Sequence, residues 1–464
     1  MDGAWQPYLA QHEDRFDREL MEFLAIPSVS TDPERRQDVR RAQEWVRRRL
    51  ETAGLQDARI LETPGHPLVY ASWLGAPGRP TVLIYGHADV QPPEPLDLWL
   101  SPPFEPQVRD GRVYARGASD MKGNLLAAIA ACEARLATEG RLPVNVKFLC
   151  EAEEEVGSPS LPAVLAAERD LLAADLAVSA DSGQAGEDQP MIVTGLRGLA
   201  GLEVSVRTAR VDLHSGLAGG IAPNAVHVLV DLLASLRDRS GRIVVEGFHD
   251  GVLPLSDEER EEIGRIPDDT PALLAAAGIA EPAGDPDFSP RERNWVRPTL
   301  EVNGIGGGYQ GEGVKTVIPC EARAKITCRL VPEQSPAQVR LALERHLRRH
   351  APAGVELTLA ALPGEGSPYL LPAAHPGQAA AARTLEAIYG KTPYQYRLGA
   401  SVPITASLKD ILGVDTVAFG FSLFDEGMHA PNEFVRLSSL RRGREAFCRL
   451  LGELAAYSKT AREG

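Results

Sequence analysis

The sequence predicts an α/β protein in which a main domain, built on a mostly parallel central sheet flanked by helices, is interrupted by an inserted α+β domain. In residues 1–197 and again in 363–464, apolar runs typical of buried strands alternate with stretches of helical periodicity. Between residues 198 and 362 the pattern changes to alternating strands with two helices. The length of 464 residues also exceeds what one hydrophobic core commonly supports, so two domains are expected.

The elements of the main domain follow from local patterns. Apolar residues at helical spacing predict two helices within residues 15–55, separated by a turn-rich segment at 27–33. Strands at 69–74 and 81–85 come next and are expected to be neighbours in the sheet. Because strands then alternate with helices, most of the sheet should be parallel and covered on both faces. The remaining predicted strands are 144–150, 176–179 and 414–419, and the remaining helices are 124–137, 160–168 and 376–388.

The inserted domain is less regular. Residues 238–296 are dense in Pro, Asp, Glu and Gly, and only 271–277 is predicted to form a helix there. Residues 304–313, GIGGGYQGEG, lack the Lys-Ser/Thr ending of a phosphate-binding loop, so a flexible loop is predicted. The strands expected in this domain are 202–206, 321–330 and 355–360, and the helices are 224–237 and 336–349.

The composition argues against two classes of partner. A formal net charge of −15 argues against a basic face for the backbone of a nucleic acid. The first 18 residues lack the apolar run of a secretory signal, and no segment is long and apolar enough to span a bilayer. Five scattered cysteines, an odd number, suit buried thiols in a reducing compartment. We therefore expect a cytoplasmic protein that binds neither nucleic acid nor membrane.

Residues that can bind metal lie where predicted strands end. Loops beyond the carboxyl ends of a parallel sheet commonly build a binding site, so residues placed there are expected to converge. The clustering of these residues indicates a metal site, which no single residue among them would indicate alone. After the four strands at 81–85, 144–150, 176–179 and 414–419 come, in chain order, His87 and Asp89, Glu154 and Glu155, Asp181 and His429, while Asp120 directly precedes a helix.

Each of these residues also has a structural interpretation. Asp120 could cap the following helix, Asp181 could form a turn, and His429 could be an ordinary core or surface histidine. The acidic run at 151–155 could be a solvated loop, but it follows an apolar strand expected in the sheet centre, where clustered carboxylates need cations. Their shared position at strand ends favours a metal site.

The residue types indicate a division of roles. His87 and Asp89 are two apart in an extended segment and point the same way, so the carboxylate can orient the imidazole. Adjacent Glu154 and Glu155 point differently, so one can bind metal while the other acts as general base. Imidazole and carboxylate ligands together suit Zn²⁺, which is favoured, and also Mn²⁺ or Co²⁺. With Asp120 as a bridging carboxylate, two divalent metal ions per subunit are expected.

Six motifs stand in order along nearly the whole chain. They are GHADVQP at 86–92, RGASDMKG at 116–123, EAEEEVGS at 151–158, DLHSGLAGG at 212–220, GVKTVIP at 313–319 and CRLVP at 328–332. In these motifs the sequence resembles the carnosinase-like metallodipeptidases of peptidase family M20, relatives of the aminoacylases and glutamate carboxypeptidases. The resemblance implies a zinc-peptidase-like catalytic domain, with the insert acting as a lid and dimerisation domain.

The resemblance also implies a role for each metal-site residue. Glu154 would move the proton, Asp89 would orient His87, and the peptide bond between Asp120 and Met121 would be cis. His87 and Asp181 would hold one ion and Glu155 and His429 the other, with Asp120 bridging the two.

A homodimer joined through the inserted domain is a further implication of the resemblance. His214 of one subunit would reach the active site of its partner and stabilise an oxyanion. Arg329 would bind a substrate carboxylate through its forked donors, and Thr316 and Ser401 would be further substrate contacts. The residue patterns alone would make His214 a loop histidine and Arg329 an exposed strand arginine.

Three functions are compatible with these residues. The first is a dipeptidase that cleaves dipeptides or similar small peptides with a free C-terminal carboxylate. The second is an N-acyl-amino-acid deacylase or carbamoylase with the same two-metal chemistry. The third is a non-catalytic metal-binding or scaffold protein, against which Glu154 counts because a scaffold needs no base. Departures from the family motifs at Ala152, Glu153 and Ala400 leave the ligand set intact and the preferred substrate open.

Overall fold

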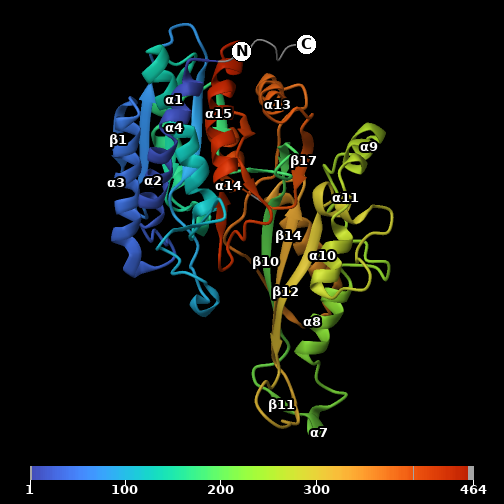
Figure 1. Ribbon diagram of the computed structural model, residues 1–464. Helices are drawn as coiled ribbons and strands as arrows, with labels where there is room; N and C mark the ends of the chain where they lie inside the picture. Colours follow the sequence, from blue (N-terminus) through green and yellow to red (C-terminus); the bar gives the residue numbers. More distant parts are fainter. Residues whose placement is uncertain (1–2, 401, 458–464) are drawn as a thin grey trace. The chain divides into compact units, whose positions relative to one another are not determined.

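The computed structural model describes residues 3–400 and 402–457 (Figure 1). The chain forms two compact units. It begins in the first unit, leaves it to form the second, and then returns to the first. That the first is a catalytic domain and the second a lid and dimerisation domain stays a prediction. The first unit comprises Met1–Thr194, Leu371–Tyr396 and Ile404–Gly464, and the second comprises Gly195–Leu370 and Arg397–Pro403.

A six-stranded sheet forms the centre of the first unit, in the order β1-β2-β6-β3-β7-β18. The four strands from β6 to β18 are parallel to one another, and β2 runs antiparallel to β6. Six of the seven residues of β3 are buried, which requires cover on both faces because successive side chains point to opposite sides. The mostly parallel sheet is therefore confirmed. The strands are β1 (Gln56–Leu61), β2 (Leu68–Trp73), β3 (Thr81–His87), β6 (Asn145–Glu151), β7 (Leu176–Ser179) and β18 (Thr416–Ala418).

Helices cover this sheet, and α2 shows the pattern of a single buried stripe. In α2, Phe16, Leu20, Phe23 and Leu24 recur at helical spacing and are all buried. The long helices α4 and α15 pack against each other. The two predicted N-terminal helices are α2 and α3, and α1 precedes them. The helices of the unit include α1 (Trp5–Gln11), α2 (Glu13–Leu24), α3 (Arg36–Thr52), α4 (Gly123–Glu139), α5 (Leu161–Ala167), α13 (Pro376–Tyr389) and α15 (Leu437–Leu454).

The expectation that the first two predicted strands are neighbours is wrong. β6 lies between β2 and β3, pairing antiparallel with β2 and parallel with β3. The segment 74–80 that links β2 to β3 is longer than a tight hairpin loop. It can cross the two strand spacings, about 10 Å, that separate strands on either side of a third.

A four-stranded antiparallel sheet, β12-β14-β10-β15, forms the second unit. Along β14, alternate residues from Ala322 to Leu330 are buried, so this strand has one core face and one more exposed face. Residues of α8 and α12 join that core face. The elements are β10 (Gly198–Arg207), β12 (Thr299–Gly307), β14 (Glu321–Leu330), β15 (Glu356–Ala361), α8 (Ala225–Ala234) and α12 (Pro336–His350).

Two expectations for this unit need correction. Residues 238–296 contain three helices, α9 (Asp257–Arg265), α10 (Thr270–Ala277) and α11 (Pro290–Trp295), where only the second was predicted. Ser256 and Ser289 each begin a capping box, which stabilises the first turn of a helix too polar to show an apolar stripe. Residues 304–307 belong to β12 rather than to a loop, because their backbone pairs with β14 despite the glycines.

Two further features concern the thiols and the helices. All five cysteines are free, and all but Cys320 are buried. Among the residues that the structure describes, none of the helices combines the length and apolarity that crossing a bilayer demands.

Candidate metal centre

Strands β3 and β7 place the first two site residues side by side. His87 is the last residue of β3, and Asp181 lies two residues beyond the end of β7. The strands are parallel and adjacent, so their carboxyl ends meet, and the Ala180 amide donates to the Tyr85 carbonyl at 2.9 Å. Asp120 comes from the segment just before α4, and the Asp120–Met121 peptide bond is cis, as the resemblance implied.

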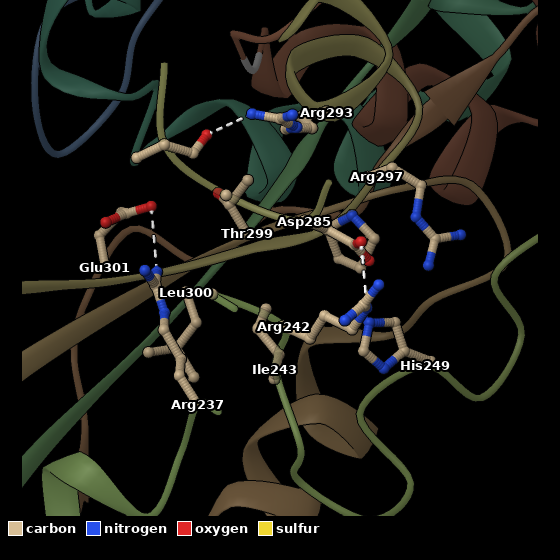
Figure 2. Close-up of a pocket in the computed structure, with 14 residues that line it drawn as sticks. Arg237, Arg242, Ile243, His249, Asp285, Arg293, Arg297, Thr299, Leu300 and Glu301 are labelled. Atoms are coloured by element: carbon tan, nitrogen blue, oxygen red, sulfur yellow. Dashed lines mark hydrogen bonds and ion pairs between the residues drawn. The ribbon is translucent and has the colours of Figure 1, made fainter. Parts of the chain in front are cut away.

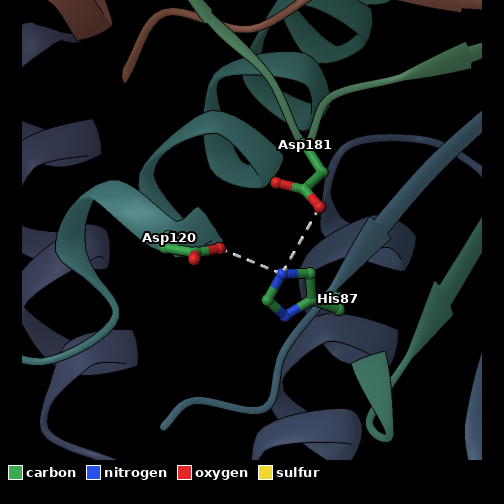
Figure 3. A group of neighbouring side chains, drawn as sticks. All are labelled: His87, Asp120 and Asp181. Carbon is green, nitrogen blue, oxygen red and sulfur yellow. Dashed lines mark hydrogen bonds and ion pairs between the residues drawn. The ribbon is translucent and has the colours of Figure 1, made fainter. Parts of the chain in front are cut away.

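One group of three possible ligands surrounds the His87 ring (Figure 3). Its Nε2 atom lies 3.2 Å from Asp120 Oδ1 and 3.9 Å from Asp181 Oδ2. One ligand atom from each of the three residues lies within 4.8 Å of the other two. The imidazole is fully buried, whereas the two carboxylates are partly exposed. This spacing suits a single cation between them.

A second group shares Asp120 with the first. His429 Nε2 lies 2.9 Å from Asp120 Oδ2 and 3.3 Å from Glu155 Oε2. These three residues also offer ligand atoms within 4.8 Å of one another. Asp120 is the residue that the two groups share, and it turns Oδ1 toward His87 and Oδ2 toward His429. A bridging carboxylate between two cations requires this arrangement.

Asp89 and Glu154 lie beside these groups without belonging to either. Asp89 is fully buried, with Oδ1 3.5 Å from His87 Nδ1 and Oδ2 accepting from the Glu155 amide at 3.1 Å. The nearer partner of His87 Nδ1 is the Asp89 backbone carbonyl, at 3.1 Å. Glu154 Oε2 is 4.0 Å from His87 Nε2, and no other described group holds its carboxylate. Glu154 is thus placed next to the ligands with its oxygens available.

Burial and the crowding of carboxylates at the site raise the pKa values of two of them, Glu154 and Asp181. Burial raises the pKa of Glu154 to about 9 and that of Asp181 to about 7, and nearby carboxylates add to both shifts. Hydrogen bonding to Asp120 raises the pKa of His429 to about 10. Although burial acts the other way, hydrogen bonds from both histidines lower the pKa of Asp120. Divalent cations would relieve this crowding by taking the place of the protons.

Sequence reasoning missed two groups that hold the proposed ligands. Gln91 donates from Nε2 to Glu155 Oε2 at 2.9 Å, and its place inside the GHADVQP motif was the available signal. Glu433 lies under the segment that carries Asp120 and is fully buried. Its position four residues after His429, directly before the buried strand β20 (Phe434–Arg436), could have indicated burial.

Glu433 fixes the backbone around Asp120. One carboxylate oxygen accepts from the amides of Ser119 and Asp120 at 2.9 and 3.1 Å. The other accepts from the Gly117 amide at 2.9 Å and from the buried guanidinium of Arg116 at 2.7 Å. Because Glu433 and His429 stand in the same loop, this carboxylate ties together the two segments that supply Asp120 and His429.

We expect Glu433→Gln to weaken metal binding by about 10-fold to 100-fold, the usual effect of removing a group that orients a ligand. Glutamine keeps the shape of the side chain, but it has one acceptor oxygen and no negative charge, so it cannot accept all four of these hydrogen bonds. The measurement is metal affinity by competition with a chelator. Glu133→Gln is the matched control, because Glu133 is also buried and bonded to arginines but lies at Arg15 and Arg49. Wild-type metal affinity in Glu433→Gln would show that this carboxylate does not position Asp120.

The remaining candidates belong mainly to the second unit. His214 is exposed on β11 (Leu213–His214), which pairs with β13 (Val317–Ile318). This pairing brings His214 beside Thr316, whose carbonyl accepts from the Ser215 amide at 3.0 Å. Arg329 is partly exposed on β14, opposite Thr299 of β12. Ser401 lies outside the described residues.

Two groups of ligands that share one carboxylate, at the carboxyl edge of a parallel sheet, define a candidate dinuclear centre of a metal-dependent hydrolase. Residues 83–453 match the profile of peptidase family M20/M25/M40. The chain belongs to this family and is a metallopeptidase.

Known relatives span nearly the whole chain. The Beta-Ala-His dipeptidase of Rattus norvegicus is 31% identical over 97% of this chain and 94% of its own length. The Cys-Gly metallodipeptidase dug1 of Schizosaccharomyces pombe is 30% identical over 96% of this chain and 97% of its own. The crystal structure of an M20 family metallo-carboxypeptidase, Sso-CP2, from Sulfolobus solfataricus matches with a TM-score of 0.83 and 32% identity, covering 95% of this chain and 99% of that one.

Proposed function

We propose that this metallopeptidase is a dipeptidase that uses two divalent cations, zinc being favoured. The observation that carries the proposal is the shared carboxylate of Asp120, with one oxygen toward His87 and the other toward His429. His87, Asp120 and Asp181 would hold one cation, and Asp120, Glu155 and His429 the other. Nitrogen and oxygen donors together suit Zn²⁺, with Mn²⁺ and Co²⁺ as alternatives. When bound, such cations supply Lewis acidity, which lowers the pKa of water and polarises a carbonyl group.

The chain's own groups supply the proton transfer. Glu154 would accept a proton from the attacking water and pass it to the leaving amine, a role that needs a carboxylate beside the ligands but not engaged by other residues. Asp89 would hold the orientation of His87 through the second ring nitrogen. Gln91 would hold Glu155 in place in the same way.

Small peptides with a free carboxylate are the proposed substrates. The named relatives act on β-Ala-His and on Cys-Gly, and Arg329 would bind the C-terminal carboxylate of such a dipeptide with its forked donors. The test compares kcat/KM for these two dipeptides with that for N-acetyl amino acids. Faster hydrolysis of dipeptides is expected. Faster hydrolysis of N-acetyl or N-carbamoyl amino acids would replace this proposal with that of a deacylase or carbamoylase using the same centre.

A homodimer through the second unit completes the proposal. The arm that carries His214 consists of residues 213–221 and 313–318, which the pairing of β11 with β13 holds together (Figure 1). It exposes apolar side chains that a monomer leaves in water: Leu217 is 80% exposed, Ile221 83% and Val314 91%. Their exposure supports the proposed dimer contact at this part of the second unit. On the proposed dimer, His214 of each subunit would donate to the developing oxyanion in its partner. The five free cysteines suit the proposed cytoplasmic location.

Mixed dimers provide a direct test of this arrangement. His214→Ala and Glu154→Gln subunits should each be inactive as homodimers. In a mixture, one site of each hybrid dimer combines an intact Glu154 with an intact His214, so about one quarter of wild-type activity is expected when subunits exchange freely. A mixture as inactive as its two components would rule out the contribution of His214 in trans.

A further inference from the structure

A charged cavity lies within the second unit, and none of the proposed metal-site or substrate residues lines it. It has a volume of about 190 Å³. Its wall is formed by the segment after α8, by residues 283–285, and by the end of α11 with the start of β12 (Figure 2). The charged residues that line it are Arg237, Arg242, Arg293, Arg297, Asp285 and Glu301.

The charge of this cavity is opposite to that of the chain. Four arginines line the cavity with two carboxylates, and Asp287 pairs with Arg242 from beside it, which leaves an excess of one positive charge, whereas the whole chain carries a formal net charge of −15. His249 also lines the cavity, and burial together with the charge of Arg297 lowers the pKa of this imidazole. His249 therefore adds hydrogen-bonding capacity at neutral pH and no charge.

Three of the four arginines are engaged by the protein. Arg237 Nη2 lies 3.3 Å from Glu301 Oε1, and Arg242 pairs with Asp285 at 3.3 Å. Arg242 also reaches Asp287 at 2.8 Å. Arg293 donates to two backbone carbonyls, those of Ala283 and Phe288, at 2.6 and 2.8 Å. These contacts hold the wall of the cavity in place.

Arg297 is different. Its guanidinium stacks over the ring of Phe288, 4.4 Å from the ring centroid, and in the described part of the chain no carboxylate or carbonyl accepts a hydrogen bond from it. Burial lowers the pKa of Arg297, and the charge of Asp285 opposes the shift. Figure 2 shows this head group on the same side of the pocket as Arg242 and His249. A half-buried cation with unused donors gains most from an anion that brings its own acceptors.

We propose that this cavity binds a small oxyanion of the phosphate type through Arg297, with Arg242 and His249 beside it. The volume of about 190 Å³ is well above the roughly 10–15 Å³ that a single water molecule needs, so the cavity accommodates a phosphate group. A phosphate group, which carries at least one negative charge at neutral pH, balances the excess of one positive charge. The planar fork of an arginine is suited to phosphate oxygens. This site is independent of the proposed peptidase function.

Hydrogen exchange of the full-length, metal-loaded protein tests the proposal. Inorganic phosphate at millimolar concentration, compared with chloride at equal ionic strength, should slow amide exchange in peptides covering residues 283–301. A parallel titration with glycerol 3-phosphate distinguishes free phosphate from a phosphomonoester as the better ligand. The localised readout separates this site from any phosphate bound at the metal centre. Absence of slowed exchange in this segment with both anions would overturn the proposal.

Variants assign the effect to Arg297. Arg297→Gln should weaken phosphate binding, read from the same exchange titration, by about ten-fold or more, the effect of losing one charged donor group. Arg348→Gln is the matched control, because it removes the same charge from an exposed position of α12. If Arg297→Gln does not fold, Arg297→Lys, which keeps the charge but loses the fork, should weaken binding in the same direction. Equal protection in wild type and the Arg297 variant would overturn the assignment.

Discussion

Glu154→Gln is expected to lower kcat for dipeptide hydrolysis by about 10²-fold to 10⁴-fold, the range for removal of a general base. Glutamine has nearly the same shape but cannot accept a proton at neutral pH. Metal content should stay at the wild-type value, because Glu154 belongs to neither group of three ligands. The measurement combines steady-state kinetics with metal analysis of the same sample.

The neighbouring residue serves as a control for Glu154. Glu153 is buried, and its carboxylate accepts from the amides of His66 and Ser160 at 2.7 and 3.0 Å, so it braces the loop. Glu153→Gln should therefore lower the thermal stability more than kcat. If Glu154→Gln turns over substrate at the wild-type rate, Glu154 is not the base, and the division of roles between Glu154 and Glu155 fails.

Asp120→Asn is expected to have the other large effect. An amide offers one oxygen where the carboxylate offers two, and it carries no charge, so it cannot bridge two cations. We expect the variant to retain at most one metal ion per chain and to lose at least about 10³ in kcat/KM, equivalent to about 4 kcal/mol of transition-state stabilisation. Metal analysis and kinetics on the same preparation measure both.

An exposed aspartate provides the comparison for Asp120. Asp97→Asn removes the same charge from an exposed position in a short 3₁₀ turn, and it should leave metal content and kcat/KM unchanged. Circular dichroism of Asp120→Asn establishes that it is folded. A folded Asp120→Asn variant with two bound ions and full activity would show that the carboxylate does not bridge.

Much of the first unit was predictable because buried parallel strands leave a clear pattern in the sequence. Buried strands give continuous apolar runs, and the residues after their carboxyl ends meet at one edge. His87 ends one strand and Asp181 follows the adjacent one, and the two side chains lie together for this reason. The order of the strands in the sheet was harder to predict, because a strand from later in the chain can pair between two strands that are consecutive in the sequence. The connection between β2 and β3 has no feature that reveals β6 between them.

The groups that hold the ligands could not be found in the same way. Glu433 is a carboxylate in a polar loop, and its function depends on four donors that come from residues 116–120, more than 300 positions earlier. The helices α9 and α11 were missed because short polar helices bury few apolar residues, and only their capping boxes identify them. Strand β12 was missed because its pairing with β14 outweighs the low strand preference of glycine.

The central claim is that His87, Asp120, Glu155, Asp181 and His429 together hold two divalent cations needed for peptide hydrolysis. Elemental analysis of the purified protein, followed by exhaustive chelation and stepwise return of Zn²⁺ while activity is measured, tests this most directly. We predict two metal ions per chain, loss of activity on chelation, and recovery that is complete only when the second ion has bound. Full activity in a chelated sample that contains less than one metal ion per chain would contradict the account.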